Sequence, residues 1–124
     1  MGGPPELPGA IGNRAEALVA DYLLERGFSI VARNLRLGRL ELDIVARRDE
    51  LVVVVEVRAR GPGAWSSGLG SMTFRKRQRI RRAGERLWQR RYRDDPSVER
   101  LRFDAASVQF GEGDPVIDYV VAAF

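Results

Sequence analysis

Residues 51–57, with the sequence LVVVVEV, form the most hydrophobic segment of the chain and constrain its fold more than any other feature. An uninterrupted run of β-branched residues is typical of a strand buried on both faces, because a strand with one solvated face alternates polar and apolar side chains. Such a strand needs packed layers above and below it. A chain of 124 residues can supply these layers within one domain and is too short for two.

The residues before this run predict a helix and two strands. Apolar residues at helical spacing indicate an amphipathic helix over residues 13–26, with Gly27 as its C-cap. Alternating apolar residues predict strands near residues 28–32 and 40–46. A tight turn at residues 47–50 joins the second of these strands to the hydrophobic run, so we expect a hairpin.

The residues after the hairpin predict a loop, a second helix and two more strands. Residues 60–72 are rich in Gly and Ser, which indicates a loop. Thr73 is a suitable N-cap for a helix that we expect to continue to about residue 92. The last strands are expected near residues 101–105 and 116–121. The order αβββαββ indicates an α/β (α+β) domain with a mixed β-sheet flanked by helices.

The composition excludes several kinds of chemistry and of location. The chain has no cysteine and no histidine, which excludes disulfides, thiolate chemistry, the usual zinc sites and relays based on histidine. The first residues lack the pattern of a signal peptide, so we expect a disordered leader over residues 1–10 and a single domain over residues 11–124. No apolar stretch approaches the roughly 18 residues of a membrane span. We therefore expect a cytoplasmic protein with no membrane partner.

Glu56 is a carboxylate inside the most hydrophobic strand, where burial without a partner is costly. If the turn places Ala46 opposite Leu51, the register brings Glu41 directly across from this carboxylate. Asp43 then lies one diagonal away, on the same face of the sheet. Like charges so close together need a cation between them, either a basic side chain or a hard divalent metal such as Mg²⁺.

The sequence leaves the identity of this cation open. Arg58 lies two residues beyond Glu56 in the same strand and therefore on the same face. A structural ion pair of Glu56 with Arg58 or with Arg39 is the simpler alternative to a metal site. Glu16 borders the apolar face of the first helix and is a further candidate for the carboxylate cluster. Asp104, in a predicted strand, is expected to pair with an arginine rather than to act as a ligand.

The second helix carries a concentration of positive charge. Residues 74–93 contain ten basic residues and one acid, Glu85, although the whole chain has a net charge of only +4. Six arginines fall near one line at about 100° per residue: Arg75, Arg79, Arg82, Arg86, Arg90 and Arg93. A solvated helix face normally mixes both signs of charge, so this pattern favours contact with phosphate backbones over simple solvation. An acidic protein partner is the next alternative.

At these residues the sequence resembles the YraN family, small bacterial proteins related to Holliday-junction resolvases in the restriction-endonuclease-like PD-(D/E)xK nuclease superfamily. The resemblance spans about residues 12–110 and rests on five segments in order: GNRAEALVADYL, RNLRLGRLELDIVAR, LVVVVEVRAR, SMTFRKRQRI and RFDAASV. It implies a restriction-endonuclease-like core of order αβββαβ and a metal-dependent nuclease site.

The nuclease site that the resemblance implies is a set of residues near the hairpin: Asp43, Glu56, Arg58, Glu41 and Glu16. Lys76 matches the basic residue that the family carries at the start of the second helix. Arg58 stands where the superfamily favours lysine. Because arginine stays protonated, it can stabilise a pentacovalent phosphorus or orient water, but it cannot act as the general base.

These observations lead to one preferred hypothesis and two alternatives. The preferred hypothesis is a DNA endonuclease, with branched and flapped DNA among its candidate substrates. Mg²⁺ or Mn²⁺ would be held by Asp43, Glu56 and the carbonyl of Val57, with Glu16 as a further carboxylate. Nucleic-acid binding is assigned to six basic residues: Arg75, Lys76, Arg79, Arg82, Arg86 and Arg90.

The first alternative is a non-catalytic nucleic-acid-binding domain that keeps the nuclease-like fold. The second is an interaction module that binds an acidic protein. Resolvase-like nucleases often act as dimers, so a homodimer is an open alternative, although nothing in the sequence marks a dimer face.

Overall fold

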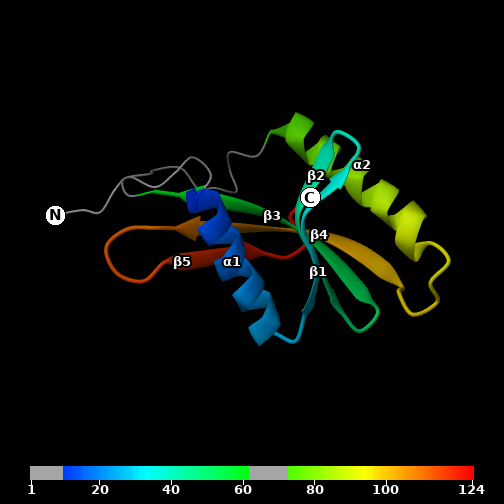
Figure 1. Cartoon of the computed structure of the whole chain (residues 1–124), viewed down its shortest axis with the longest axis horizontal. Coiled ribbons are helices and arrows are strands. Elements are labelled where there is room, and N and C mark those ends of the chain that lie inside the picture. The colour runs from blue at the N-terminus through cyan, green and yellow to red at the C-terminus, as the bar shows by residue number, and fades with distance from the viewer. Residues whose placement is uncertain (1–9, 62–72) are drawn as a thin grey trace.

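The structure, a computed structural model, describes residues 10–61 and 73–124. The described elements follow the predicted order (Figure 1): α1 (Ala10–Glu25), β1 (Ser29–Leu37), β2 (Leu40–Arg48), β3 (Leu51–Arg60), α2 (Phe74–Leu87), the π-helical turn η1 (Trp88–Tyr92), β4 (Arg100–Gln109) and β5 (Val116–Val120). The predicted leader, apart from Ala10, and most of the predicted loop at residues 60–72 lie outside the described residues. Within residues 10–61 and 73–124, no helix is long and apolar enough to cross a membrane.

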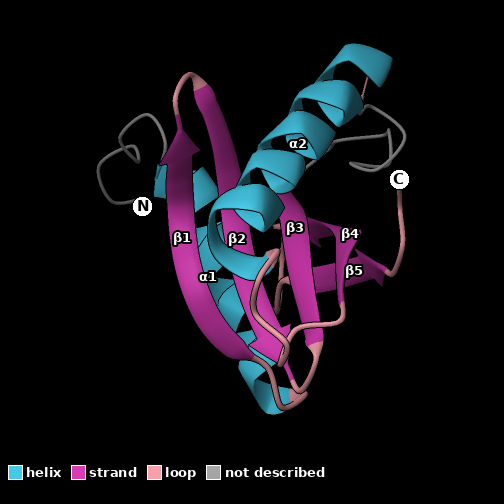
Figure 2. Ribbon diagram, turned by 90° about the vertical axis from the view of Figure 1, so that its right-hand side faces the viewer, coloured by secondary structure: helices cyan, strands magenta, loops and turns pink. Residues whose placement is uncertain are grey.

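The five strands form one sheet in the order β1-β2-β3-β4-β5. The pairs β1–β2, β2–β3 and β4–β5 are antiparallel, whereas β3 and β4 are parallel, so the sheet is mixed as predicted. A parallel pair needs a crossover connection, and α2 lies on that connection. Figure 2 shows α2 in front of the sheet and α1 behind it. The fold therefore has three layers, helix, sheet and helix.

The alternate side chains of β3 belong to two separate hydrophobic clusters. Val53 and Val55 pack in the cluster that includes Val19 of α1. Val52 and Val54 pack in the cluster that includes Ile80 of α2. These four valines are at most 1% exposed, which confirms a central strand buried on both faces.

The β2–β3 hairpin has a different register from the predicted one. Ala46 pairs with Val53 and not with Leu51, because β2 continues to Arg48 and the turn contains only two residues. Asp49 in this turn has a φ of 53°, in the left-handed region that aspartate tolerates better than most side chains. The register therefore differs by two residues from the expected one, which changes the residue opposite Glu56.

The second helix is α-helical only as far as Leu87. The segment Trp88–Tyr92 forms a π-helical turn. In it, the backbone N–H of Arg93 donates a hydrogen bond of 2.7 Å to the carbonyl of Trp88. A π-helical turn closes hydrogen bonds between residues five apart, so the spacing of about 100° per residue does not continue through it. Arg90 and Arg93 therefore do not extend the straight line of arginines that the sequence predicts.

Asp104 of β4 is completely buried and anchors the end of the chain. Its carboxylate accepts two hydrogen bonds from the guanidinium of Arg102, at 2.8 and 2.9 Å. It also accepts a hydrogen bond of 2.6 Å from the hydroxyl of Tyr119 and one of 2.9 Å from the backbone N–H of Ala122. This network confirms that Asp104 pairs with an arginine, as the sequence predicts.

Candidate functional site

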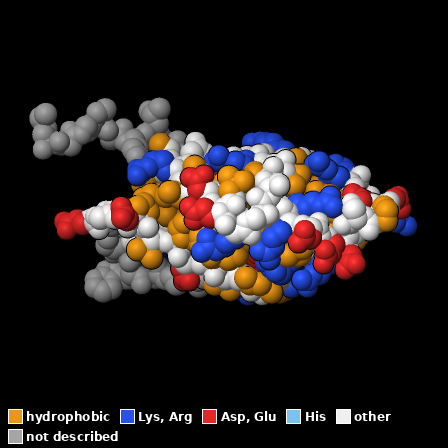
Figure 3. Space-filling model, turned by 90° about the horizontal axis from the view of Figure 1, so that it is seen from below, with side chains coloured by type: hydrophobic (Ala, Val, Ile, Leu, Met, Phe, Trp, Pro, Cys, Tyr) orange, Lys and Arg blue, Asp and Glu red, His pale blue; other side chains and the backbone are white. Residues whose placement is uncertain are grey.

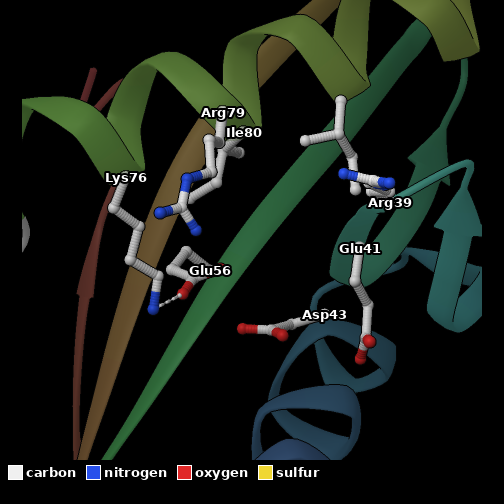
Figure 4. Close-up of a pocket in the computed structure, with 8 residues that line it drawn as sticks. Arg39, Glu41, Asp43, Glu56, Lys76, Arg79 and Ile80 are labelled. Atoms are coloured by element: carbon white, nitrogen blue, oxygen red, sulfur yellow. Dashed lines mark ion pairs between the residues drawn. The ribbon is translucent and has the colours of Figure 1, made fainter.

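A cavity of about 250 Å³ lies between α2 and the ends of β2 and β3 (Figure 4). It is lined by eight residues: Arg39, Leu40, Glu41, Asp43, Glu56, Lys76, Arg79 and Ile80. The cavity therefore brings together three of the carboxylates that the sequence singled out and two of the basic residues assigned to nucleic-acid binding. Arg58 and Glu16 do not line it.

Asp43 lies where β2 and β3 separate. The last residue pair of the β2–β3 ladder is Ile44 with Val55, although both strands continue past it. Oδ2 of Asp43 accepts a hydrogen bond of 2.9 Å from the backbone N–H of Val57, so a side chain continues the pairing where the backbone ladder stops. Asp43, and not Glu41, is therefore the residue next to Glu56.

Glu56 is only 5% exposed and forms an ion pair with Lys76. The distance from Nζ of Lys76 to Oε1 of Glu56 is 2.6 Å. Thr73 fixes the start of α2, because its Oγ1 accepts a hydrogen bond of 3.1 Å from the backbone N–H of Lys76. The alternative that Glu56 pairs with Arg58 or Arg39 is wrong in its partner, which is Lys76, the only lysine of the sequence.

The site holds two neighbouring carboxylates and a single ammonium paired with one of them. Burial and, after it, the charge of Glu56 raise the pKa of Asp43 to about 7. The hydrogen bond from Val57 and the charge of Lys76 act in the opposite direction and do not cancel this shift. Arg79 points from α2 toward Glu56 in Figure 4. Among the described residues, no ion pair neutralises the ionised form of Asp43, and a bound divalent ion would supply the missing positive charge.

We expect the metal-free protein to lose stability as the pH rises from about 4 to above 7. Over this interval native Asp43 holds a proton that the unfolded chain, with a pKa near 3.8, has released. The free energy of unfolding therefore falls with increasing pH, by roughly 2–4 kcal/mol in total. Urea unfolding in EDTA at pH 5 and pH 8.5 measures the difference, and Asp43→Asn should remove most of it. Equal or greater stability of the unmodified protein at pH 8.5 would contradict this account.

Glu41 and Glu16 lie at the edge of the site and have partners of their own. Glu41 is exposed, and in Figure 4 its carboxylate lies apart from that of Asp43, which points toward Glu56. Its Oε2 lies 3.7 Å from Nε of Arg36. Oε2 of Glu16 accepts a hydrogen bond of 3.0 Å from Nδ2 of Asn34. Burial, the largest cause, raises the pKa of Glu16, and the nearby charge of Asp43 adds to the shift, so Glu16 lies close to the site without lining its cavity.

Arg58 is half-buried in β3 beyond the cavity. Its Nε is buried and has no hydrogen-bond partner within the described part of the chain. The basic side chain paired with Glu56 is Lys76, from the neighbouring helix.

The exposed side of α2 is strongly basic. Arg75, Arg79 and Arg82 are exposed, and Arg86 donates a hydrogen bond of 3.3 Å to the carbonyl of Leu37. Other parts of the surface are different, because the face in Figure 3 carries both basic and acidic side chains. The exposed side of α2 therefore carries positive charge next to the cavity, which Arg79 also lines.

Comparison with known sequences identifies the family of this chain. Residues 15–108 match the Uncharacterised protein family UPF0102. UPF0102 protein sce2912 of Sorangium cellulosum is 49% identical over 116 residues, which cover 93% of this chain and 81% of that protein. UPF0102 proteins of Anaeromyxobacter dehalogenans and Nocardia farcinica are 38% and 40% identical, each over 93% of this chain and over 84% and 89% of their own length. The chain belongs to the UPF0102 family, which confirms the predicted resemblance to YraN.

Proposed function

We propose that this protein binds nucleic acid and hydrolyses phosphodiester bonds in DNA with the help of Mg²⁺ or Mn²⁺. The proposal rests above all on one observation, the meeting of Asp43, Glu56 and Lys76 in a cavity beside a basic helix. Such a reaction needs three parts: carboxylates that hold a metal, an ammonium group, and a surface that binds phosphates. A DNA endonuclease also agrees with the cytoplasmic location expected from the sequence.

The residues of the cavity fit a hard divalent cation. Asp43 and Glu56 supply carboxylate oxygens, and the carbonyl of Val57 is a further oxygen donor on the same strand. Within residues 10–61 and 73–124, no three Asp, Glu, His or Cys side chains gather into a metal-binding group. Two carboxylates are nevertheless enough for Mg²⁺, which keeps several waters and binds substrate phosphates. Glu16 is the nearby carboxylate that we propose as an additional ligand.

The ion, when bound, lowers the pKa of a coordinated water and neutralises charge on the attacked phosphate. Asp43 and Glu56, which line the cavity, would hold it. We assign the stabilisation of the pentacovalent phosphorus to the ammonium of Lys76, because it lies inside the cavity. The unpartnered Nε of Arg58 is a second candidate for this role.

We expect the arginines of α2 to bind the phosphate backbone without a choice of sequence. Replacing Arg75, Arg79 and Arg82 by Gln should weaken DNA binding and reduce the slope of log affinity against log salt by up to about 0.9 for each phosphate that is no longer bound. Arg26→Gln, an exposed arginine directly after the helix that covers the opposite face, is the matched control. Fluorescence anisotropy over a range of salt concentrations measures both. An unchanged slope in the triple variant would exclude this side of α2 as the DNA-binding surface.

A cleavage assay tests the proposal directly. Labelled duplex, single-stranded, flapped and branched DNA are incubated with the protein in Mg²⁺, in Mn²⁺ and in EDTA. We expect cleavage of at least one substrate in the presence of metal and none in EDTA. Binding without cleavage of any substrate would contradict the enzymatic assignment.

The Glu56–Lys76 ion pair also favours one alternative, a non-catalytic nucleic-acid-binding domain. In that case the pair satisfies Glu56 on its own, and the carboxylates have only a structural function. Neutralising Asp43 would then change no activity of the protein. An interaction module for an acidic protein predicts no DNA binding near physiological salt.

A further inference from the structure

The flank of α2 that faces away from the carboxylate cavity forms a second groove, of about 290 Å³. Its lining combines two aromatic rings, two arginines and an amide: Phe74, Phe124, Arg77, Arg81 and Gln78. The side chain of Phe74 is among the large apolar groups left in solvent, with 74% of the residue exposed. No acidic side chain is among these lining residues.

The second aromatic ring is held in place by β4. The backbone N–H of Ala123 donates a hydrogen bond of 2.8 Å to the carbonyl of Phe103. The rings of Phe103 and Phe124 are in contact, with centroids 5.5 Å apart. Figures 1 and 2 place the C-terminal residue near the beginning of α2. The groove is therefore bounded by α2 on one side and by an anchored aromatic residue on the other.

We infer that this groove binds an unpaired strand of nucleic acid, with a base against the ring of Phe74 and phosphates near Arg77 and Arg81. Every base has a flat face that stacks on an aromatic side chain, and the backbone follows positive charge, so this combination is suited to single strands without sequence preference. The two arginine side chains favour a polyanion over a basic or neutral protein segment. The inference rests on the proposed function and extends it to the form of the substrate.

The position of α2 explains how one substrate would use both grooves. Lys76 and Arg79 line the carboxylate cavity on one flank of the helix, whereas Arg77 and Arg81 line the aromatic groove on the other. The first turns of α2 thus stand between the two grooves. A duplex end or branch whose strands separate at this helix would place one strand at the carboxylates and the other on Phe74. The favoured substrate is therefore DNA with a single-stranded arm beside a duplex.

The variant Phe74→Ala tests this inference, and Leu24→Ala is its control. Both side chains are exposed, at 74% and 53%, and Leu24 lies on α1, so neither change should affect folding. Anisotropy is measured with labelled oligo(dT) and with a blunt duplex. We expect Phe74→Ala to weaken oligo(dT) binding by about ten-fold and to leave duplex binding within about two-fold. Leu24→Ala should change neither affinity.

A double variant, Arg77→Gln with Arg81→Gln, provides a second readout. It should reduce the salt dependence of oligo(dT) binding by up to about 0.7 for each phosphate released and affect the duplex less. If Phe74→Ala and this double variant leave oligo(dT) affinity unchanged while the unmodified protein still cleaves DNA, the inference is overturned and the proposed function stands. Equal reductions in affinity for oligo(dT) and duplex also overturn it. If the unmodified protein binds neither probe, both proposals are rejected.

Discussion

Replacing Asp43 by Asn should reduce metal-dependent DNA cleavage by on the order of 10³-fold and leave DNA affinity almost unchanged. Asp43 supplies a carboxylate oxygen to the lining of the cavity, whereas Arg75 and Arg82 lie on the exposed surface of α2 outside it. An asparagine oxygen can still accept the hydrogen bond from the N–H of Val57, so the strand ends should keep their arrangement. Rates under single-turnover conditions and anisotropy with the same DNA measure the two effects.

The same substitution should make the metal-free protein more stable at pH 8.5. It removes a half-buried carboxylate whose pKa is raised to about 7 and whose charge lies close to that of Glu56. A gain of a few kcal/mol at most is expected, which corresponds to a rise of roughly 5–10 °C in Tm. The exposed Asp21→Asn is the matched control. Loss of cleavage together with higher stability would separate a role in the reaction from a folding defect, and retained cleavage would contradict the assignment of Asp43.

Replacing Asp104 by Ala should destabilise the protein by about 3–5 kcal/mol. The substitution leaves the guanidinium of Arg102 without its buried partner and removes the acceptor from the hydroxyl of Tyr119 and from the N–H of Ala122. The strand β5 and the residues after it should loosen first, because Asp104 is the shared acceptor through which Tyr119 and Ala122 are held to β4.

Urea unfolding compares Asp104→Ala with Asp118→Ala, an exposed substitution on β5 that should cost less than about 0.5 kcal/mol. If Asp104→Ala does not fold, Asp104→Asn gives the measurable case, because it keeps one acceptor and removes the charge. A reduction in stability below about 1 kcal/mol in both variants would show that the network contributes little to the free energy of unfolding.

The layered fold is predictable because its main signal is local. Residues 51–57 are apolar except for Glu56, and a strand of this kind has to be covered on both faces, as Val52 and Val53 are. The same run makes Glu56 conspicuous as a buried carboxylate. The order of elements follows from the helical and alternating patterns on either side.

The hairpin register is not predictable from the same pattern. Side chains alternate with a period of two, so a shift of two residues leaves every side chain on its original face. The turn at Asp49 and Glu50 carries no Gly or Asn that would have marked its two-residue length. The expected pairing of Glu41 with Glu56 failed for this reason, whereas the expectation that Asp43 lies near Glu56 did not depend on it.

The pairing of Lys76 with Glu56 could have been predicted from helical spacing. Lys76 was instead grouped with the neighbouring arginines because all of them are basic. Lys76 precedes Ile80 by four residues and Ala83 by seven, so it lies on the buried stripe of the helix and not among the exposed arginines. Helical spacing alone would have directed this lysine toward the sheet. The π-helical turn that displaces Arg90 has no comparable signal in the sequence.

The most direct test of the account is a Mn²⁺ titration, followed by electron paramagnetic resonance, of the protein and of its Asp43→Asn variant, each with and without a short branched DNA. The account predicts Mn²⁺ binding by the unmodified protein that DNA strengthens and that Asp43→Asn removes, while both proteins still bind the DNA. Bound DNA with no Mn²⁺ bound by either protein would contradict a metal site at Asp43 and Glu56 and would leave their cluster with Lys76 as a structural feature of a binding domain.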